Sequence, residues 1–102
     1  MEPTPVALVG AGYIADFHLT ALSEDPQVRV LAVCDPDLDR ARALAAAHGV
    51  PDCVADLAEL PALGVRVIHL CTPPDLHAPL IRRALDAGLH VFCEKPLALC
   101  EA

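Results

Sequence analysis

The stretch V-A-L-V-G-A-G-Y-I-A-D-F-H, residues 6–18, decides the fold of this chain. Its first four residues are apolar and predict a buried strand, which a glycine turn then interrupts. Beyond the turn, apolar residues at helical spacing predict the buried face of a helix; they are Ile14, Phe17, Ala21 and Leu22. A strand, a glycine turn and a helix in direct succession are typical of a dinucleotide-binding unit, here in the form G-x-G-x-x-A.

Each small position of this motif has a physical reason. Gly10 lets the chain turn tightly out of the strand, and Gly12, without a Cβ atom, lets a pyrophosphate approach the backbone. Ala15 lets the helix lie close to the strand. The N–H groups of the first helical turn would then face the phosphates. A plain glycine turn is the alternative, but the flanking strand and helix favour cofactor binding.

Length and composition restrict the class of protein. At 102 residues we expect one domain, residues 1–102, and the 55% apolar content excludes a disordered chain. The net charge of −7 disfavours nucleic acid and anionic membrane surfaces as partners. No apolar run reaches the roughly 18 residues that span a bilayer. The first residues, M-E-P-T-P, lack the features of a signal peptide, so we expect a cytoplasmic protein.

The five cysteines do not form a recognisable framework. Their number is odd, and no C-x-x-C pair occurs, so neither disulfides nor a zinc site is indicated. Several end apolar strands, where small buried side chains in a reducing compartment are expected.

Apolar strands alternate with amphipathic helices along the whole chain. The predicted strands are residues 6–9, 28–34, 51–54, 65–70 and 90–93, and the later helices are residues 38–48, 57–60 and 76–87. This alternation predicts an α/β fold, a doubly wound parallel sheet of the Rossmann type with helices on both faces. Right-handed crossovers give the strand order 3-2-1-4-5, with a ligand crevice where the chain reverses direction between strands 1 and 4.

Asp35 directly follows the second predicted strand. It lies 35 − 12 = 23 residues after Gly12, close to the spacing of the acidic residue that binds the adenosine ribose. Its carboxylate would repel the 2′-phosphate of NADP, with Asp37 and Asp39 adding to the repulsion and two arginines partly offsetting it, so we favour NAD. Alternatively, Asp35 caps the second helix, with Pro36 at its first position.

Lys95 is the only lysine of the chain, and it follows the fifth predicted strand. A lysine beside a substrate can exchange a proton with a hydroxyl or carbonyl oxygen. The alternative is a surface charge paired with Glu94. Thr72 and His77 follow the fourth strand, where ligand contact and local capping both remain open.

Four segments together resemble one known family. They are G-A-G-Y-I-A, C-D-P-D, C-T-P-P-D-L-H and C-E-K-P-L-A, which follow or end strands 1, 2, 4 and 5. The sequence resembles the NAD(P)-dependent oxidoreductases of the glucose-fructose oxidoreductase, inositol dehydrogenase and rhizopine-catabolism family, which act on sugars, inositols and related polyols. The resemblance implies pyrophosphate contacts from Gly10, Gly12, Tyr13 and Ile14, a ribose contact from Asp35, nicotinamide-side contacts from Thr72, Pro73, His77 and Glu94, and a catalytic role for Lys95.

Family members carry a second, substrate-binding domain that these 102 residues do not include. We therefore expect this chain alone to bind cofactor without turning over a polyol, and to self-associate through the edge of its fifth strand. A non-catalytic dinucleotide sensor and a domain for another nucleotide are the alternatives. Lys95 argues against the sensor, and Asp35 with the glycine motif argues against the other nucleotide.

Overall fold

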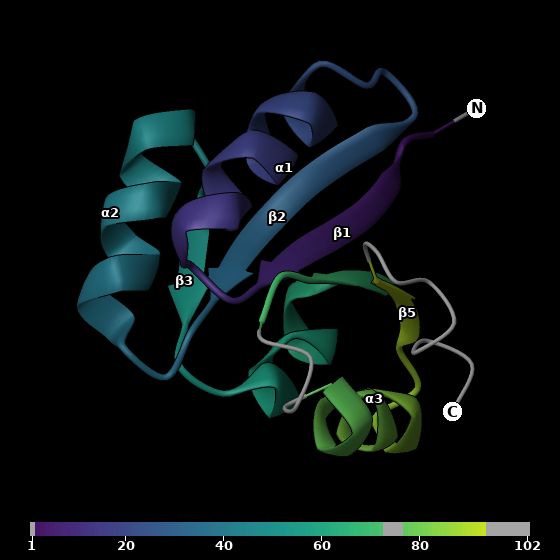
Figure 1. The fold of residues 1–102 in the computed structure, drawn as a ribbon. Helices are drawn as coiled ribbons and strands as arrows, with labels where there is room; N and C mark the ends of the chain where they lie inside the picture. Colours follow the sequence, from purple (N-terminus) through teal and green to yellow (C-terminus); the bar gives the residue numbers. More distant parts are fainter. Residues whose placement is uncertain (1, 73–76, 94–102) are drawn as a thin grey trace.

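The computed structural model of the chain describes residues 2–72 and 77–93, and Figure 1 shows its ribbon. Pro73, Glu94 and Lys95 therefore lie outside the described residues. The elements, in order, are β1 (Thr4–Val9), α1 (Tyr13–Ser23), β2 (Val28–Cys34), α2 (Leu38–His48), β3 (Asp52–Val54), the short 3₁₀ helices η1 (Leu57–Glu59) and η2 (Pro61–Leu63), β4 (Val67–Leu70), α3 (His77–Asp86) and β5 (His90–Cys93).

The strands form one parallel sheet in the order β3-β2-β1-β4-β5, which confirms the predicted fold class and strand order. In the register of the sheet, Val9 of β1 lies opposite both Cys34 of β2 and Leu70 of β4. The three central strands therefore end level with one another. The segments that follow them emerge side by side at one end of the sheet, which we call the carboxyl end.

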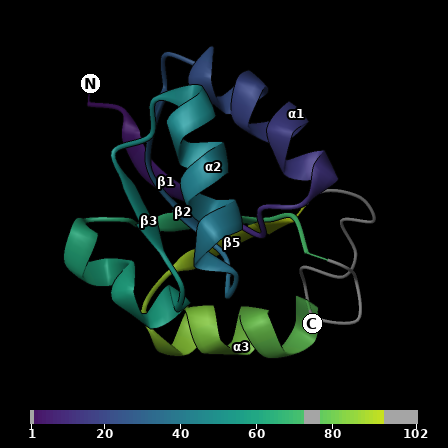
Figure 2. The same cartoon turned by 90° about the vertical axis from the view of Figure 1, so that its left-hand side faces the viewer.

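Helices cover both faces of the sheet, as the alternation of elements predicted. Figure 2 shows α1 and α2 on one side and α3 on the other. Because successive strand residues point to opposite faces, Leu8 and Val33 pack against α1 and α2. Their neighbours Val9 and Cys34 belong to the second buried cluster, which includes residues of α3 and η1.

The buried face of α1 differs from the predicted one. Ile14 and Phe17 are 60% and 69% exposed, whereas Ala15 and Leu19 are fully buried. Apolar residues occupy two overlapping helical stripes in α1, so periodicity alone did not separate them. The stripe that packs is the one whose small member, Ala15, allows the helix to lie close to the sheet.

Most predicted element boundaries agree with the structure within two residues. β1 begins two residues earlier than predicted and β4 two residues later. The predicted helix 57–60 is the 3₁₀ helix η1, and the side chain of Asp56 caps it. No helix that the structure describes has the length and apolar character needed to cross a bilayer.

Candidate functional site at the carboxyl end of the sheet

The glycine turn, residues 10–12, is wedged between the ends of β2 and β4. Its Gly10 has a φ of +102°, a backbone conformation that favours glycine. A Cβ atom on Gly10 would lie 2.8 Å from Cγ2 of Thr72 and 3.0 Å from the carbonyl carbon of Cys71. The Gly10 N–H donates to the carbonyl of Cys34 at 2.7 Å. The turn is therefore tight because the chain after β4 passes directly against it.

Asp35 ties this turn to the end of β2. Its side chain is buried, with only 7% of the residue exposed. Oδ2 accepts the N–H of Ala11 at 2.8 Å, and Oδ1 accepts the N–H of Asp37 at 2.7 Å. A carboxylate has about four acceptor positions, so about two remain, which matches the two hydroxyls of a ribose.

The alternative prediction, that Asp35 caps the second helix, is wrong. The N-cap of α2 is Asp37, whose Oδ1 accepts the N–H of Arg40 at 3.3 Å. A capping residue directly precedes the first residue of its helix. The alternative required the helix to begin at Pro36, whereas α2 begins two residues later, at Leu38.

The first turn of α1 faces the same region with its backbone donors uncapped by a side chain. Gly12 is the N-cap of α1, has an ordinary φ of −81°, and makes no side-chain capping bond. A Cβ atom on Gly12 would meet the Arg40 guanidinium at 3.2 Å. Backbone donors, the helix dipole and this guanidinium together favour an anion beside the turn.

Several charged side chains of α1 and α2 lie close to an oppositely charged or hydrogen-bonding neighbour. Arg42 pairs with Asp39 at 3.5 Å on the exposed surface of α2. Asp16, in the first turn of α1, lies 2.6 Å from Nε2 of His48 at the end of α2. Within residues 2–72 and 77–93, the charged groups placed beside the turn are the carboxylates of Asp35 and Asp37 and the guanidinium of Arg40, which together carry one net negative charge.

A cavity of about 280 Å³ opens beneath the turn on the α3 side of the sheet. Its size is close to the lower end of the range for small-molecule pockets, about 300–1,000 Å³. The described residues that line it come from the ends of β1 and β2 and the segments after them, the β3–η1 segment, the residues after β4, and α3: Val9, Gly10, Cys34, Pro36, Ala55, Asp56, Leu57, Thr72, Pro79, Leu80 and Arg83. Apolar side chains dominate, so the cavity suits a flat apolar group that carries a few polar atoms.

Two charged residues line this cavity, and one buried thiol does so too. Asp56 accepts a hydrogen bond from Arg83 at 2.5 Å, and its Oδ1 also accepts the N–H of Ala58. These contacts, the backbone one first, lower the pKa of Asp56. Burial, with the nearby Asp56 and Asp35 carboxylates, raises the pKa of Cys34 to about 12. Cys34 is free and stays a neutral side chain, in line with the structural role predicted for the cysteines.

The structure brings together Gly10, Gly12, Asp35 and Thr72. Tyr13 and Ile14 begin α1 beside the turn, and His77 begins α3. Three further site residues were not predicted from the sequence: Arg40, Asp56 and Arg83. No local pattern in the sequence indicates that an arginine of α3 reaches Asp56.

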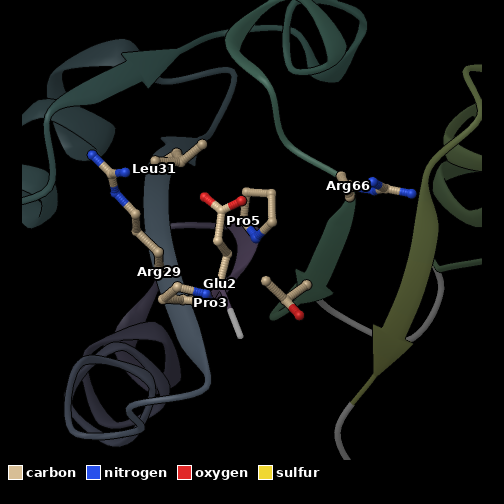
Figure 3. Close-up of a pocket in the computed structure, with 7 residues that line it drawn as sticks. Glu2, Pro3, Pro5, Arg29, Leu31 and Arg66 are labelled. Atoms are coloured by element: carbon tan, nitrogen blue, oxygen red, sulfur yellow. The ribbon is translucent and has the colours of Figure 1, made fainter.

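A second, larger cavity of about 590 Å³ lies at the opposite, amino end of the sheet. Figure 3 shows Glu2 near its centre, with Arg29 of β2 and Arg66 before β4 on either side. The two guanidinium groups point away from each other in this view. The described side chains that Figure 3 labels do not bring their polar groups together, so they offer no arrangement that would orient a ligand.

Comparison with known proteins gives a consistent result. Residues 4–102 match the model of the oxidoreductase family described as having an NAD-binding Rossmann fold. The chain is 40% identical over 92 residues to inositol 2-dehydrogenase of Rhizobium meliloti (strain 1021), covering 90% of this chain and 28% of that protein. It is 38% identical over 100 residues to D-glucoside 3-dehydrogenase of Escherichia coli (strain K12), covering 96% and 28%.

Solved structures share the fold. GenD2 from gentamicin A biosynthesis, in complex with NAD, superimposes with a TM-score of 0.86 at 30% identity, covering 99% of this chain and 32% of that one. KijD10, a 3-ketoreductase from Actinomadura kijaniata in complex with TDP-benzene and NADP, gives 0.84 at 32% identity, covering 97% and 35%. The chain thus spans about a third or less of the length of these proteins, and similar folds hold NAD or NADP.

Proposed function

Because this chain belongs to the oxidoreductase family with the NAD-binding Rossmann fold, we propose that residues 1–102 form the cofactor-binding domain of an NAD(P)-dependent enzyme that acts on a sugar, an inositol or a related polyol. One observation carries the proposal. The G-x-G-x-x-A turn lies where the chain reverses direction between β1 and β4, and the buried Asp35 carboxylate is hydrogen-bonded to that turn. Ligands of open α/β sheets bind at such a position.

The described residues fit the adenosine and pyrophosphate parts of the cofactor. The pyrophosphate lies against Gly10, Gly12 and the first turn of α1, where Tyr13 and Ile14 begin the helix. The ribose hydroxyls donate to the two remaining acceptor positions of Asp35. The adenine ring enters the apolar cavity that starts beside Gly10.

The roles proposed for residues around the nicotinamide half of the cofactor rest on the family resemblance. When bound, the nicotinamide ring supplies or accepts the hydride. Thr72, Pro73 and His77 border that half of the cofactor, and Glu94 contacts its ribose. Lys95 takes the proton from the substrate hydroxyl as the carbon is oxidised, or returns it on reduction. In a longer version of the protein, Lys95→Ala should lower turnover about 100-fold and leave cofactor affinity nearly unchanged. If cofactor binding were lost instead, Lys95 would contact the cofactor and not the substrate.

We favour NAD over NADP because of the charge beside the ribose. Arg42 is already paired with Asp39, so it offers little to a 2′-phosphate. Arg40 is directed to Gly12 and hence to the pyrophosphate. The buried Asp35 carboxylate then faces a 2′-phosphate with like charge, which is unfavourable.

Calorimetric titration of NADH and NADPH tests the proposal. Asp35→Ala should weaken NADH more than NADPH, because it removes the ribose acceptor and also the repulsion of the 2′-phosphate. Asp25→Ala is the matched control, since it removes a carboxylate in the turn between α1 and β2 that accepts a local backbone N–H, that of Gln27. Equal losses for both cofactors in Asp35→Ala would show that Asp35 only supports the turn. Absence of binding by the unaltered chain would refute the cofactor function.

Association and location are further parts of the proposal. β5 is an edge strand of the described sheet, and its Phe92 is 44% exposed. Exposed edges recruit other chains, so we expect these 102 residues to self-associate, and a monodisperse monomer in light scattering would contradict this. The free, buried thiol of Cys34 suits a reducing cytoplasm, which cell fractionation would test.

A further inference from the structure

The carboxylate of Asp56 has no role in the function proposed above, yet it lines the same apolar cavity as Gly10 and Pro36. Asp56 follows β3, which is the neighbour of β2 in the sheet. The N–H of Asp35 donates to the carbonyl of Val54 at 3.0 Å, so the end of β2 is fastened to the end of β3. In the function proposed above, the ribose lies at Asp35 and the adenine enters this cavity, so Asp56 lies in the part of the site that receives the base.

Asp56 is held in place from two sides. Its Oδ1 accepts the N–H of Ala58 at 3.0 Å, within the cap of η1. The same oxygen accepts from the guanidinium of Arg83 at 2.5 Å, across to α3. These donors favour the ionised form and lower the pKa of Asp56. At neutral pH its side chain is therefore a carboxylate, which accepts hydrogen bonds and cannot donate them. Because a carboxylate has about four acceptor positions, capacity remains for a ligand donor.

We propose that Asp56, positioned by Arg83, accepts a hydrogen bond from the exocyclic amine of adenine and so selects adenine over a purine with a carbonyl oxygen at that position. The inference rests on the proposed cofactor function and adds the identity of the base to it. The walls of the cavity supply apolar contact to any purine ring, since Val9, Leu57 and Leu80 line it. Discrimination between purines must therefore come from its polar residues, and a fixed carboxylate rejects a carbonyl oxygen.

The test compares NADH with reduced nicotinamide hypoxanthine dinucleotide, in which a carbonyl oxygen replaces the amine and the adjacent ring nitrogen N1 carries a hydrogen. The two molecules share their charges, phosphates, riboses and nicotinamide. Calorimetric titration of the unaltered chain should give a preference for NADH of about tenfold or more, the effect of one hydrogen bond to a charged acceptor. Equal affinity for the two dinucleotides would overturn the inference while leaving the cofactor function intact. Binding of neither would overturn both.

Asp56→Asn assigns the preference to this side chain. Asparagine caps helices as well as aspartate does, so η1 should keep its cap. Its amide can also donate to a carbonyl oxygen, so the preference for NADH should fall to about twofold or reverse. Arg83→Gln should reduce the preference less, because Asp56 keeps its backbone donor. An unchanged preference in Asp56→Asn would exclude the proposed contact.

Asp25→Asn is the matched control variant. Asp25 lies in the turn between α1 and β2, and its Oδ1 accepts the N–H of Gln27 at 2.8 Å, so the chemical change and the local backbone contact resemble those at Asp56. It is not among the residues of the cavity. The ratio of the two affinities should equal that of the unaltered chain, and a changed ratio would mean that the effect of Asp56→Asn is not specific to the base.

Discussion

The two ends of the sheet both carry cavities and charged side chains, and they use them differently. At the amino end, the larger cavity of about 590 Å³ has arginines that point away from each other. At the carboxyl end, a cavity of about 280 Å³ lies beside a glycine turn and a buried carboxylate that is bonded to that turn. Convergence of polar groups, and not volume, distinguishes a binding site from a surface hollow.

The parallel sheet explains why the groups converge at one end only. Every βα connection leaves the sheet at the carboxyl end, where helices also present their N-terminal N–H groups. The central strands end level there, so Gly10, Asp35 and Cys71 become neighbours although they are far apart in the sequence. At the amino end, the helices end and the chain returns to the sheet. Helix C-termini present carbonyl oxygens, which do not bind an anion.

The largest expected effect is on stability, at Gly10. Gly10→Ala should lower the free energy of unfolding by about 3 kcal/mol, because a positive φ and a close backbone contact act together. Gly49→Ala is the matched control, with a φ of +69° and no atom within 4 Å of the added Cβ. It should cost about 1 kcal/mol. Urea unfolding measures both, and equal losses would show that the turn relaxes away from β4.

The next effect is on binding, at Gly12. Gly12→Val should leave the fold intact, since φ is −81° and only the end of the flexible Arg40 side chain must move. Its methyl groups would occupy the approach of the pyrophosphate, so NADH affinity should fall about 100-fold, equivalent to about 2.7 kcal/mol. NADH titration with far-UV circular dichroism separates the two properties. Retained affinity would mean that the turn has only a structural role.

The fold could be predicted largely from local patterns. Apolar strands and turn residues fixed the order of elements, and crossover handedness then restricted the strand order, which the structure confirms. The face of α1 could not be predicted, because Ile14 and Phe17 are as apolar as the buried Leu19. Which apolar stripe of α1 packs against the sheet depends on how closely α1 approaches β2. Helical periodicity in the sequence gives no information on that distance.

The site residues could be predicted from the sequence only where a single residue and its spacing from a motif indicate the role. Gly10 and Asp35 were found from the motif and its spacing, but the hydrogen bond from Ala11 to Asp35 joins the segments that follow β1 and β2 and has no local signal in the sequence. The same holds for the pair Asp56 and Arg83, which joins η1 to α3 across 27 residues of sequence. Contacts of this kind follow from the assembled sheet.

A smaller effect concerns the thiol of Cys34 in the carboxyl-end cavity. Its pKa is raised from 9.0 to about 12, first by burial. Below pH 9 the folded and unfolded chains both keep this proton, and between pH 9 and 12 only the unfolded chain loses it, so stability falls as pH rises. Urea unfolding from pH 8 to 10.5 should show a shallower fall for Cys34→Ala than for the unaltered chain. Cys53→Ala, which retains Cys34, should keep the original slope; identical slopes in all three would contradict the assignment.

The smallest effect is expected at the amino end, and it completes the comparison. Arg66→Ala removes an exposed guanidinium, while the backbone bonds of residue 66 to Pro5 and His90 remain. Stability should therefore change by less than about 0.5 kcal/mol. NADH affinity should stay within about twofold, because salt screens exposed charges beyond a Debye length of about 8 Å.

Arg40→Ala makes the same change of net charge at the carboxyl end, beside Gly12. It should weaken NADH about three- to tenfold, since a guanidinium there contributes a charge-assisted contact to the pyrophosphate. Both variants remove one positive charge from the protein, so they differ only in the position of the charge that is lost. If Arg66→Ala weakened NADH as much as Arg40→Ala does, the two ends of the sheet would act through net charge alone, and the local account of the carboxyl end would fail.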